Sequence, residues 1–163
     1  MALGTASGKK CTPLTSVSVV VARAWPAEIL KGNLNIPKHH FIIKRTDYTE
    51  VPLYLSLSDL ALFFILPVFS KSASSPIKQG EIMSMGIPIV CNSGVGDTDF
   101  VLNKYDCGVL VNNFTEKDYD SAIRKVLNTS FDKNTIRNAA KDFYDLETGI
   151  NAYHKTYEKA LIK

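Results

Sequence analysis

Short apolar runs alternate with segments of helical spacing over the first two thirds of the chain. Each run has strand length and is rich in β-branched or aromatic residues, which favours buried strands of a parallel sheet. The predicted strands cover residues 17–21, 41–43, 60–66, 88–91 and 108–111. The predicted helices between them cover residues 26–30, 50–57, 76–86 and 98–104. This alternation predicts an α/β fold, a Rossmann-like doubly wound parallel sheet with helices on both faces.

The last third of the chain has helical spacing only, so the sheet is expected to carry a helical C-terminal tail. Helices are predicted at residues 116–127, 134–144 and 146–161. In the last of them Leu146, Ile150, Tyr153, Tyr157 and Leu161 recur every three or four residues, which predicts a face packed on the core. Residues 1–16 show no clear period, and we expect a poorly defined segment there, followed by one domain over 17–163.

Composition narrows the class of protein. The 163 residues are 45% hydrophobic and 21% charged, which is typical of one globular domain. The net charge of +3 is dispersed and gives no case for nucleic-acid binding. No apolar run reaches the roughly 18 residues of a membrane span, and residues 1–10 lack the apolar core of a signal peptide. Three cysteines without CxxC spacing favour neither a disulfide framework nor a zinc site and make the cytoplasm the default location.

The most informative stretch is a strand, a serine-rich loop and a helix start. Pro76 can begin the helix, Ser74 or Ser75 can cap it, and Gly86 can end it. Unpaired backbone N–H groups and the positive helix end make such a junction suitable for phosphate groups, and Lys78 adds a cation.

Glu81 is predicted to project from the same side of this helix as Lys78. Its carboxylate can accept hydrogen bonds from two neighbouring ribose hydroxyls. The alternative is an ordinary surface ion pair between Lys78 and Glu81, which contributes little to stability.

A glycine loop, Ser93-Gly94-Val95-Gly96-Asp97, follows the strand at 88–91. Asp99 occupies the third glycine position of a dinucleotide fingerprint, which argues against NAD binding. A tight turn that allows close backbone approach to a ligand is the better interpretation of Gly94 and Gly96. The three histidines form no metal-binding pattern, so no metal site is predicted.

Residues 74–101, SSPIKQGEIMSMGIPIVCNSGVGDTDFV, resemble the nucleotide-sugar-binding segment of the group-one glycosyltransferases, which have the GT-B fold. The resemblance rests on a small-residue loop, Glu81, a Met-Gly-Ile-Pro-Ile turn into a strand, the glycine loop, and the later strand Gly-Val-Leu-Val. It extends over roughly residues 17–161.

The resemblance implies the C-terminal, donor-binding domain of an enzyme that transfers a sugar from a nucleoside diphosphate to a hydroxyl acceptor. It implies retention of anomeric configuration, with no metal and no cofactor beyond the nucleotide-sugar donor. Glu81 would bind the ribose of the donor. The amides near Ser74, Ser75 and Ile77, with the side chain of Lys78, would face the diphosphate, beside the loop of Gly94 and Gly96. Residues 43–46, including Arg45 and Thr46, would border the base, and no catalytic residue is assigned.

Two departures from the family pattern matter. A second glutamate usually precedes the first by eight positions, where this chain has Ala73. The resemblance leads us to expect that an acceptor-binding N-terminal domain is missing here, and residues 1–16 lack the expected Gly-Arg-x-x-x-Lys-Gly context around Lys9 and Lys10. We therefore expect this chain alone to bind donor without transferring sugar.

Other interpretations stay open. In the resembling family the final helix braces the N-terminal domain, so its aromatic face would be exposed here and could support self-association. One alternative function is a non-catalytic nucleotide-binding or partner-binding remnant, which Ala73 favours slightly. Another is a Rossmann-type response or oxidoreductase domain, which the incomplete glycine fingerprint and the lack of an acidic phosphoacceptor cluster oppose.

Overall fold

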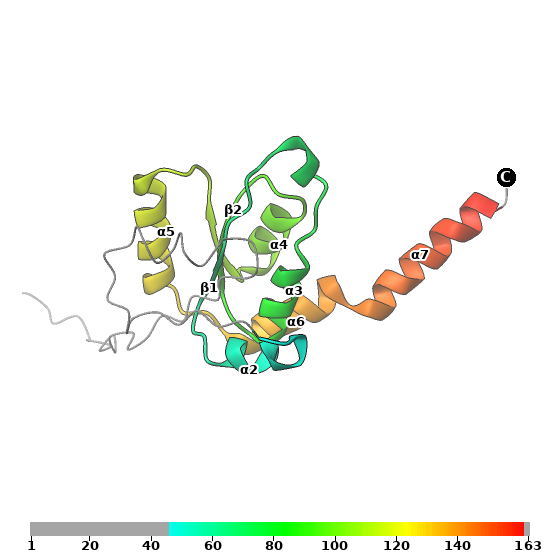
Figure 1. Ribbon diagram of the computed structural model, residues 1–163, viewed down its shortest axis with the longest axis horizontal. Coiled ribbons are helices and arrows are strands. Elements are labelled where there is room, and N and C mark those ends of the chain that lie inside the picture. The colour runs from blue at the N-terminus through cyan, green and yellow to red at the C-terminus, as the bar shows by residue number, and fades with distance from the viewer. Residues whose placement is uncertain (1–45, 162–163) are drawn as a thin grey trace, which may run out of the picture.

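The computed structural model describes residues 46–161 (Figure 1). The predicted strands at 17–21 and 41–43, the helix at 26–30 and the boundary at residue 16 lie outside the described residues. The elements in chain order are η2 (Tyr48–Glu50), α2 (Val51–Ser56), β1 (Ala61–Phe63), η3 (Phe69–Lys71), α3 (Ile77–Ser84), β2 (Ile89–Asn92), α4 (Thr98–Tyr105), β3 (Gly108–Val111), α5 (Glu116–Asn128), α6 (Lys133–Tyr144) and α7 (Leu146–Leu161).

The three described strands form one parallel sheet in the order β1-β2-β3. Val90 pairs with Leu62 on one side and with Val109 on the other. Every residue of the central strand β2 is buried, as expected for a parallel strand that is covered on both faces.

Side-chain alternation divides the core into two layers. Ile89 and Cys91 belong to the cluster formed with α3, α4 and α6, whereas Val90 packs with Val109 and with Ala122 of α5. Figure 1 shows α5 on one side of the sheet, with α3, α4 and α6 on the other. The predicted α/β fold with helices on both faces is confirmed.

Two local predictions differ from the structure. Strand β1 covers Ala61–Phe63 instead of residues 60–66, because after Phe63 the backbone of Ile65 bonds to the side chain of Asn92. Neither Ser74 nor Ser75 caps α3. Pro76 holds the N-cap position with extended backbone, and no side chain caps this helix.

Helix α7 extends away from the sheet (Figure 1) and has no buried residue. Tyr153 is 69% exposed and Tyr157 is 65% exposed, so the prediction that this face packs on the core is wrong. The chain turns at Asp145, which has extended backbone and accepts hydrogen bonds from the backbone N–H and the hydroxyl of Thr148. Helical spacing therefore correctly predicted an apolar face on this helix, but it did not determine which surface, if any, covers that face. Over the described range 46–161, no helix is both long enough and apolar enough to cross a membrane.

Candidate functional site

The carboxyl ends of the three parallel strands lie at one edge of the sheet, the upper edge in Figure 1. The loops that leave this edge cover residues 64–76, 93–97 and 112–115. In open parallel sheets, ligands bind at this edge. It is where the sequence places most of its candidate residues.

Asn92, the last residue of β2, joins the first two loops. Its Oδ1 atom accepts from the N–H of Ile65 at 2.7 Å, while its Nδ2 atom donates to the carbonyls of Ile65 (2.8 Å) and Ser93 (2.9 Å). The residue is 3% exposed. Asn92 was not among the residues predicted from the sequence. The available signal was one polar residue that ends an apolar strand directly before a glycine loop.

Aromatic side chains connect the first loop to the third. The ring of Phe64 meets Phe114 edge-on at 6.3 Å between centroids and Tyr119 at 5.5 Å. Edge-to-face geometry at these separations is favourable. Together with Asn92, these rings hold all three loops of the carboxyl edge in one arrangement.

Gly96 lies directly against the serine loop. Its φ is +46°, and a Cβ atom built there would be 1.6 Å from the carbonyl oxygen of Ser74. Gly94 also has a positive φ, and its N–H donates to Asp99 at 3.1 Å. The sequence predicted that a ligand approaches the backbone here, whereas the structure shows the backbone of Ser74 close to Gly96. This places the serine and glycine loops in direct backbone contact.

The first turn of α3 begins immediately after this contact. Ile77 is 77% exposed and Lys78 is exposed, while Glu81, one turn later, is partly exposed. Within residues 46–161 an ion pair joins Lys104 to Asp142, and none joins Lys78 to Glu81. The alternative of a surface Lys78–Glu81 pair is therefore wrong. A lysine, a glutamate and the first amides of a helix remain available to a ligand beside the joined loops.

Thr46 lies elsewhere. Its hydroxyl donates to the carboxylate of Glu50 at 2.5 Å, in the segment that leads into α2. In Figure 1, α2 lies below the lower edge of the sheet, opposite the three loops. The structure does not bring Thr46 together with the other candidates. Arg45 and Ile43 lie outside the described residues.

Tyr144, the last residue of α6, packs against α3 behind these loops. A Cβ atom on Gly80 would lie 2.8 Å from Cγ of the Tyr144 ring, and Phe143 meets that ring edge-on at 4.9 Å. The hydroxyl is buried and has no hydrogen-bond partner of good geometry among the described residues. Burial raises the pKa of the phenol, the Asp97 carboxylate raises it further, and the side chain of Ser75 opposes the shift.

Gly80→Ala should destabilise the protein although alanine is the better helix former by about 1 kcal/mol. The added methyl group would displace the Tyr144 ring, whose Cγ atom cannot move without shifting the side chain. Urea unfolding would measure the difference. Gly149→Ala is the matched control, because nothing lies within 4 Å of a Cβ at that helical glycine. Greater stability in Gly80→Ala would contradict the packing described here.

The two described cysteines offer no nucleophile. Cys91 and Cys107 are free and buried. Burial raises the pKa of the Cys107 thiol to about 11 and raises that of Cys91 further. A reactive cysteine needs the thiolate, which such pKa values disfavour. In the described part of the chain, no three histidine, cysteine or acidic side chains gather as a metal site would require.

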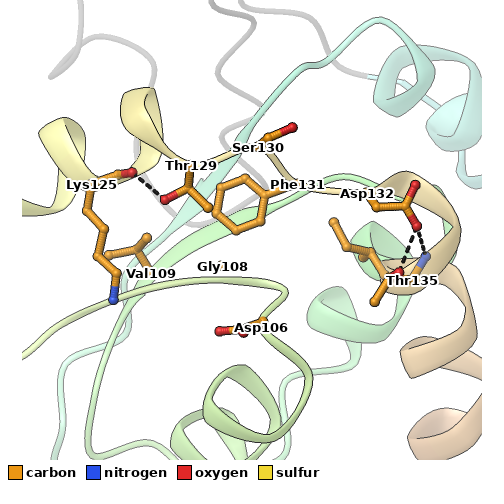
Figure 2. A pocket seen from close by; sticks show the side chains of 10 residues that line it. Asp106, Gly108, Val109, Lys125, Thr129, Ser130, Phe131, Asp132 and Thr135 are labelled. Carbon is orange, nitrogen blue, oxygen red and sulfur yellow. Dashed lines mark hydrogen bonds between the residues drawn. The ribbon is translucent and has the colours of Figure 1, made fainter.

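Two hollows lie away from the carboxyl edge. One, of about 410 Å³, opens where β3 begins, between the end of α5 and the start of α6 (Figure 2). Lys125 and Asp106 line it, and its third charged group, Asp132, already accepts two hydrogen bonds of 2.7 Å from Thr135. The other, of about 440 Å³, lies at the junction of α6 and α7. Neither hollow is lined by a residue that was predicted from the sequence to bind a ligand.

The comparisons with known proteins agree with this geometry. The chain resembles sucrose-phosphate synthase from Thermosynechococcus elongatus in structure, with a TM-score of 0.57 and 16% identity. The match covers 77% of this chain and 31% of that one, so the chain spans about a third of the synthase, and the likeness concerns the fold. No curated protein matches the sequence. The sequence model of the glycosyl transferases group 1 matches residues 27–143, more than half of the chain, and includes all three described strands. The segment that resembles the family lies at the joined loops and the start of α3, on a parallel sheet, and the family's sequence model matches most of the chain. The chain therefore belongs to the glycosyl transferases group 1.

Proposed function

We propose that this chain is a donor-binding domain that holds a nucleoside-diphosphate sugar, whose sugar is transferred to a hydroxyl acceptor. Family membership supports glycosyl transfer in general. The observation that carries the donor site is the contact between Gly96 and Ser74, which presents two loops and the start of α3 as one preorganised surface.

The diphosphate would lie against the first turn of α3. The N–H groups of Ile77 and Lys78 are in the first two helical positions, where no intrahelical acceptor exists for them. The Lys78 ammonium, the positive helix end and the hydroxyls of Ser74 and Ser75 add to an anion site. These groups would stabilise the negative charge that develops on the nucleoside-diphosphate leaving group as the glycosidic bond breaks.

Glu81 would bind the ribose. It follows Lys78 by three residues on the same helix, and no ion pair within the described residues occupies its carboxylate. An ionised carboxylate can accept hydrogen bonds from two neighbouring hydroxyls. Gly94 and Gly96 would form the floor of the site, and the base-bordering role of Arg45 and Thr46 rests on the resemblance alone.

The acceptor would bind to a separate domain. The chain matches 31% of the length of the synthase, and the described residues offer no convincing general base. We expect this chain by itself to bind donor nucleotide and to transfer no sugar. An activity assay with the isolated chain would check the second point, and measurable transfer would contradict it.

Glu81→Ala should abolish stabilisation by a nucleoside diphosphate. In the wild-type chain, a ligand at 100 times its Kd adds about 2.7 kcal/mol, which raises Tm by roughly 5 to 10 °C. The measurement is Tm with UDP, GDP, ADP and NAD in turn, first on the wild-type chain and then on Glu81→Ala. Glu147→Ala, an exposed glutamate in the first turn of α7, is the matched control.

The outcomes of this experiment are distinct. A shift with one nucleoside diphosphate that disappears in Glu81→Ala and persists in Glu147→Ala would support the donor site. A shift with NAD alone would favour an oxidoreductase domain. No shift with any of the four ligands would overturn the donor proposal.

One observation favours a second function, a non-catalytic remnant that binds a protein partner or itself. Helix α7 exposes Tyr153, Tyr157 and Leu161 along one face, and large exposed apolar patches are typical of interaction sites. Analytical ultracentrifugation of the wild-type chain and of Tyr157→Lys would test self-association. A monomer at every concentration would exclude self-association as the use of this face.

A further inference from the structure

The hollow where β3 begins brings together four segments of the chain. Its walls are the turn after α4, the start of β3, the end of α5, and the loop and first helical turn that begin α6. The hollow has a volume of about 410 Å³, which is within the range of small-molecule sites. Because it opens at the amino end of a parallel strand, it lies at the edge of the sheet opposite the candidate donor site.

Apolar side chains form the inner wall of the hollow. Val109 and Ile136 are buried, and the partly buried ring of Phe131 packs on both layers of the core. Figure 2 shows this ring between the side chains of Lys125 and Asp132. The face of an aromatic ring carries partial negative charge, so it attracts C–H groups, which carry partial positive charge. A ring-shaped ligand with C–H groups on one face therefore fits this wall.

Asp106 supplies a carboxylate to the hollow from a strained position. It follows the last residue of α4 with φ +51° and ψ +36°, in the left-handed region where glycine is the usual residue. Among the described residues it is the one residue other than glycine with a positive φ. Strained residues of this kind cluster at functional sites. Asp106 is exposed and takes part in no ion pair within residues 46–161, so its carboxylate is available to a ligand.

Lys125 supplies the opposite charge from the last turn of α5, and over the same range it is likewise in no ion pair. Figure 2 shows its ammonium and the Asp106 carboxylate on the same side of the Phe131 ring. The third charged group, Asp132, is already occupied by two hydrogen bonds from Thr135. The two available charges cancel, so the hollow favours neither an anion nor a cation. A ligand with several hydroxyls satisfies both charges, because a hydroxyl can donate to a carboxylate and accept from an ammonium.

We propose that this hollow is a glycan site, which binds one sugar unit of a neutral glycan. The sugar ring packs its C–H face on Phe131, while its hydroxyls donate to Asp106 and accept from Lys125. Glycosyl transfer, the activity of the family, produces such glycans. The site does not depend on the donor proposal, since it shares no residue with the donor site. It anchors a glycan at the far edge of the sheet and takes no part in the transfer itself.

The test is a titration of the full chain, labelled for amide NMR, with methyl glucoside, methyl galactoside and methyl mannoside in turn. At least one glycoside should shift the amide signals of residues 106–109 and 129–136 and leave those of residues 74–81 unchanged. Free lysine, which carries both charges and no hydroxyl on its side chain, is the competing ligand. Shifts of the hollow with free lysine alone, or with none of the glycosides, would overturn the glycan site.

Asp106→Gly removes the carboxylate and suits the left-handed backbone, so its unfolding midpoint in urea should be unchanged or higher. It should weaken glycoside binding about tenfold, as expected for the loss of hydrogen bonds to a charged group. Lys125→Ala should also weaken binding. Lys117→Ala, an exposed lysine in the first turn of α5 that does not line the hollow, is the matched control. A Kd unchanged in Asp106→Gly, or equal losses in Lys125→Ala and Lys117→Ala, would overturn the site.

The same variants keep this inference separate from the donor proposal. Asp106→Gly should retain any stabilisation by a nucleoside diphosphate, and Glu81→Ala should retain glycoside binding in the hollow. A chain that binds glycoside here but no nucleotide would support the glycan site and contradict the donor site. A chain with the opposite behaviour would overturn the glycan site alone.

Discussion

Gly96→Ala should lower the free energy of unfolding by about 3 kcal/mol, a loss that few single substitutions of a loop residue produce. The new Cβ atom would lie 1.6 Å from the carbonyl oxygen of Ser74 and 2.5 Å from its carbonyl carbon, so the two loops must separate. The φ of +46° adds strain for any residue with a side chain. Urea unfolding, followed by circular dichroism, measures the loss.

Separation of the loops should also remove nucleotide binding. Ser74 and Ser75 precede the first turn of α3, and a shift of the serine loop would move both from the proposed diphosphate site. Gly149→Ala is again the control, with a stability change within about 1 kcal/mol. A Gly96→Ala protein of wild-type stability would show that the contact between the loops is not as close as described.

Asn92→Ala should cost about 2 to 4 kcal/mol, the second largest effect that we expect. The substitution removes an amide oxygen that accepts one hydrogen bond and an NH2 group that donates two, and it leaves the N–H and carbonyl of Ile65 without their side-chain partner. Because Asn92 is 3% exposed, water cannot readily replace the lost bonds. Chemical denaturation gives the loss of stability.

Two further variants sharpen this test. Asn92→Asp keeps an acceptor for the N–H of Ile65 but loses the amide donor, so a buried carboxylate would face the Ile65 carbonyl. It should be destabilising as well. Asn151→Ala changes an exposed asparagine on α7 and should alter stability by no more than about 0.5 kcal/mol. If Asn92→Ala behaved like Asn151→Ala, the loop after β1 would be held by other contacts.

Most of the described fold could be predicted from local pattern. The strand at 108–111 and the helix at 146–161 have the predicted bounds, and the helix expected at 116–127 ends one residue later. Gly86 ends α3 with a φ of +73°, as its position after a helical segment predicts. These features depend on side-chain spacing and backbone preference, which a sequence displays directly.

The candidate site was predicted from the sequence only in part. The positions of Ser74, Lys78, Glu81 and Gly96 at one edge of the sheet follow from their places after parallel strands, and their use by a donor remains a prediction. The contacts of Asn92 and Tyr144 were not predicted. The partner of Asn92 is Ile65, 27 residues away, and the ring of Tyr144 lies on Gly80, 64 residues earlier in the chain.

By itself, the sequence determined the class of fold, the order of the described elements and the family segment, because each depends on residues close together in the chain. The tertiary structure decided which side chains connect the loops and where β1 ends. It also decided that α7 extends away from the core, with its apolar face exposed. Those features depend on contacts between distant segments, and spacing along the chain specifies an apolar face without naming the surface that meets it.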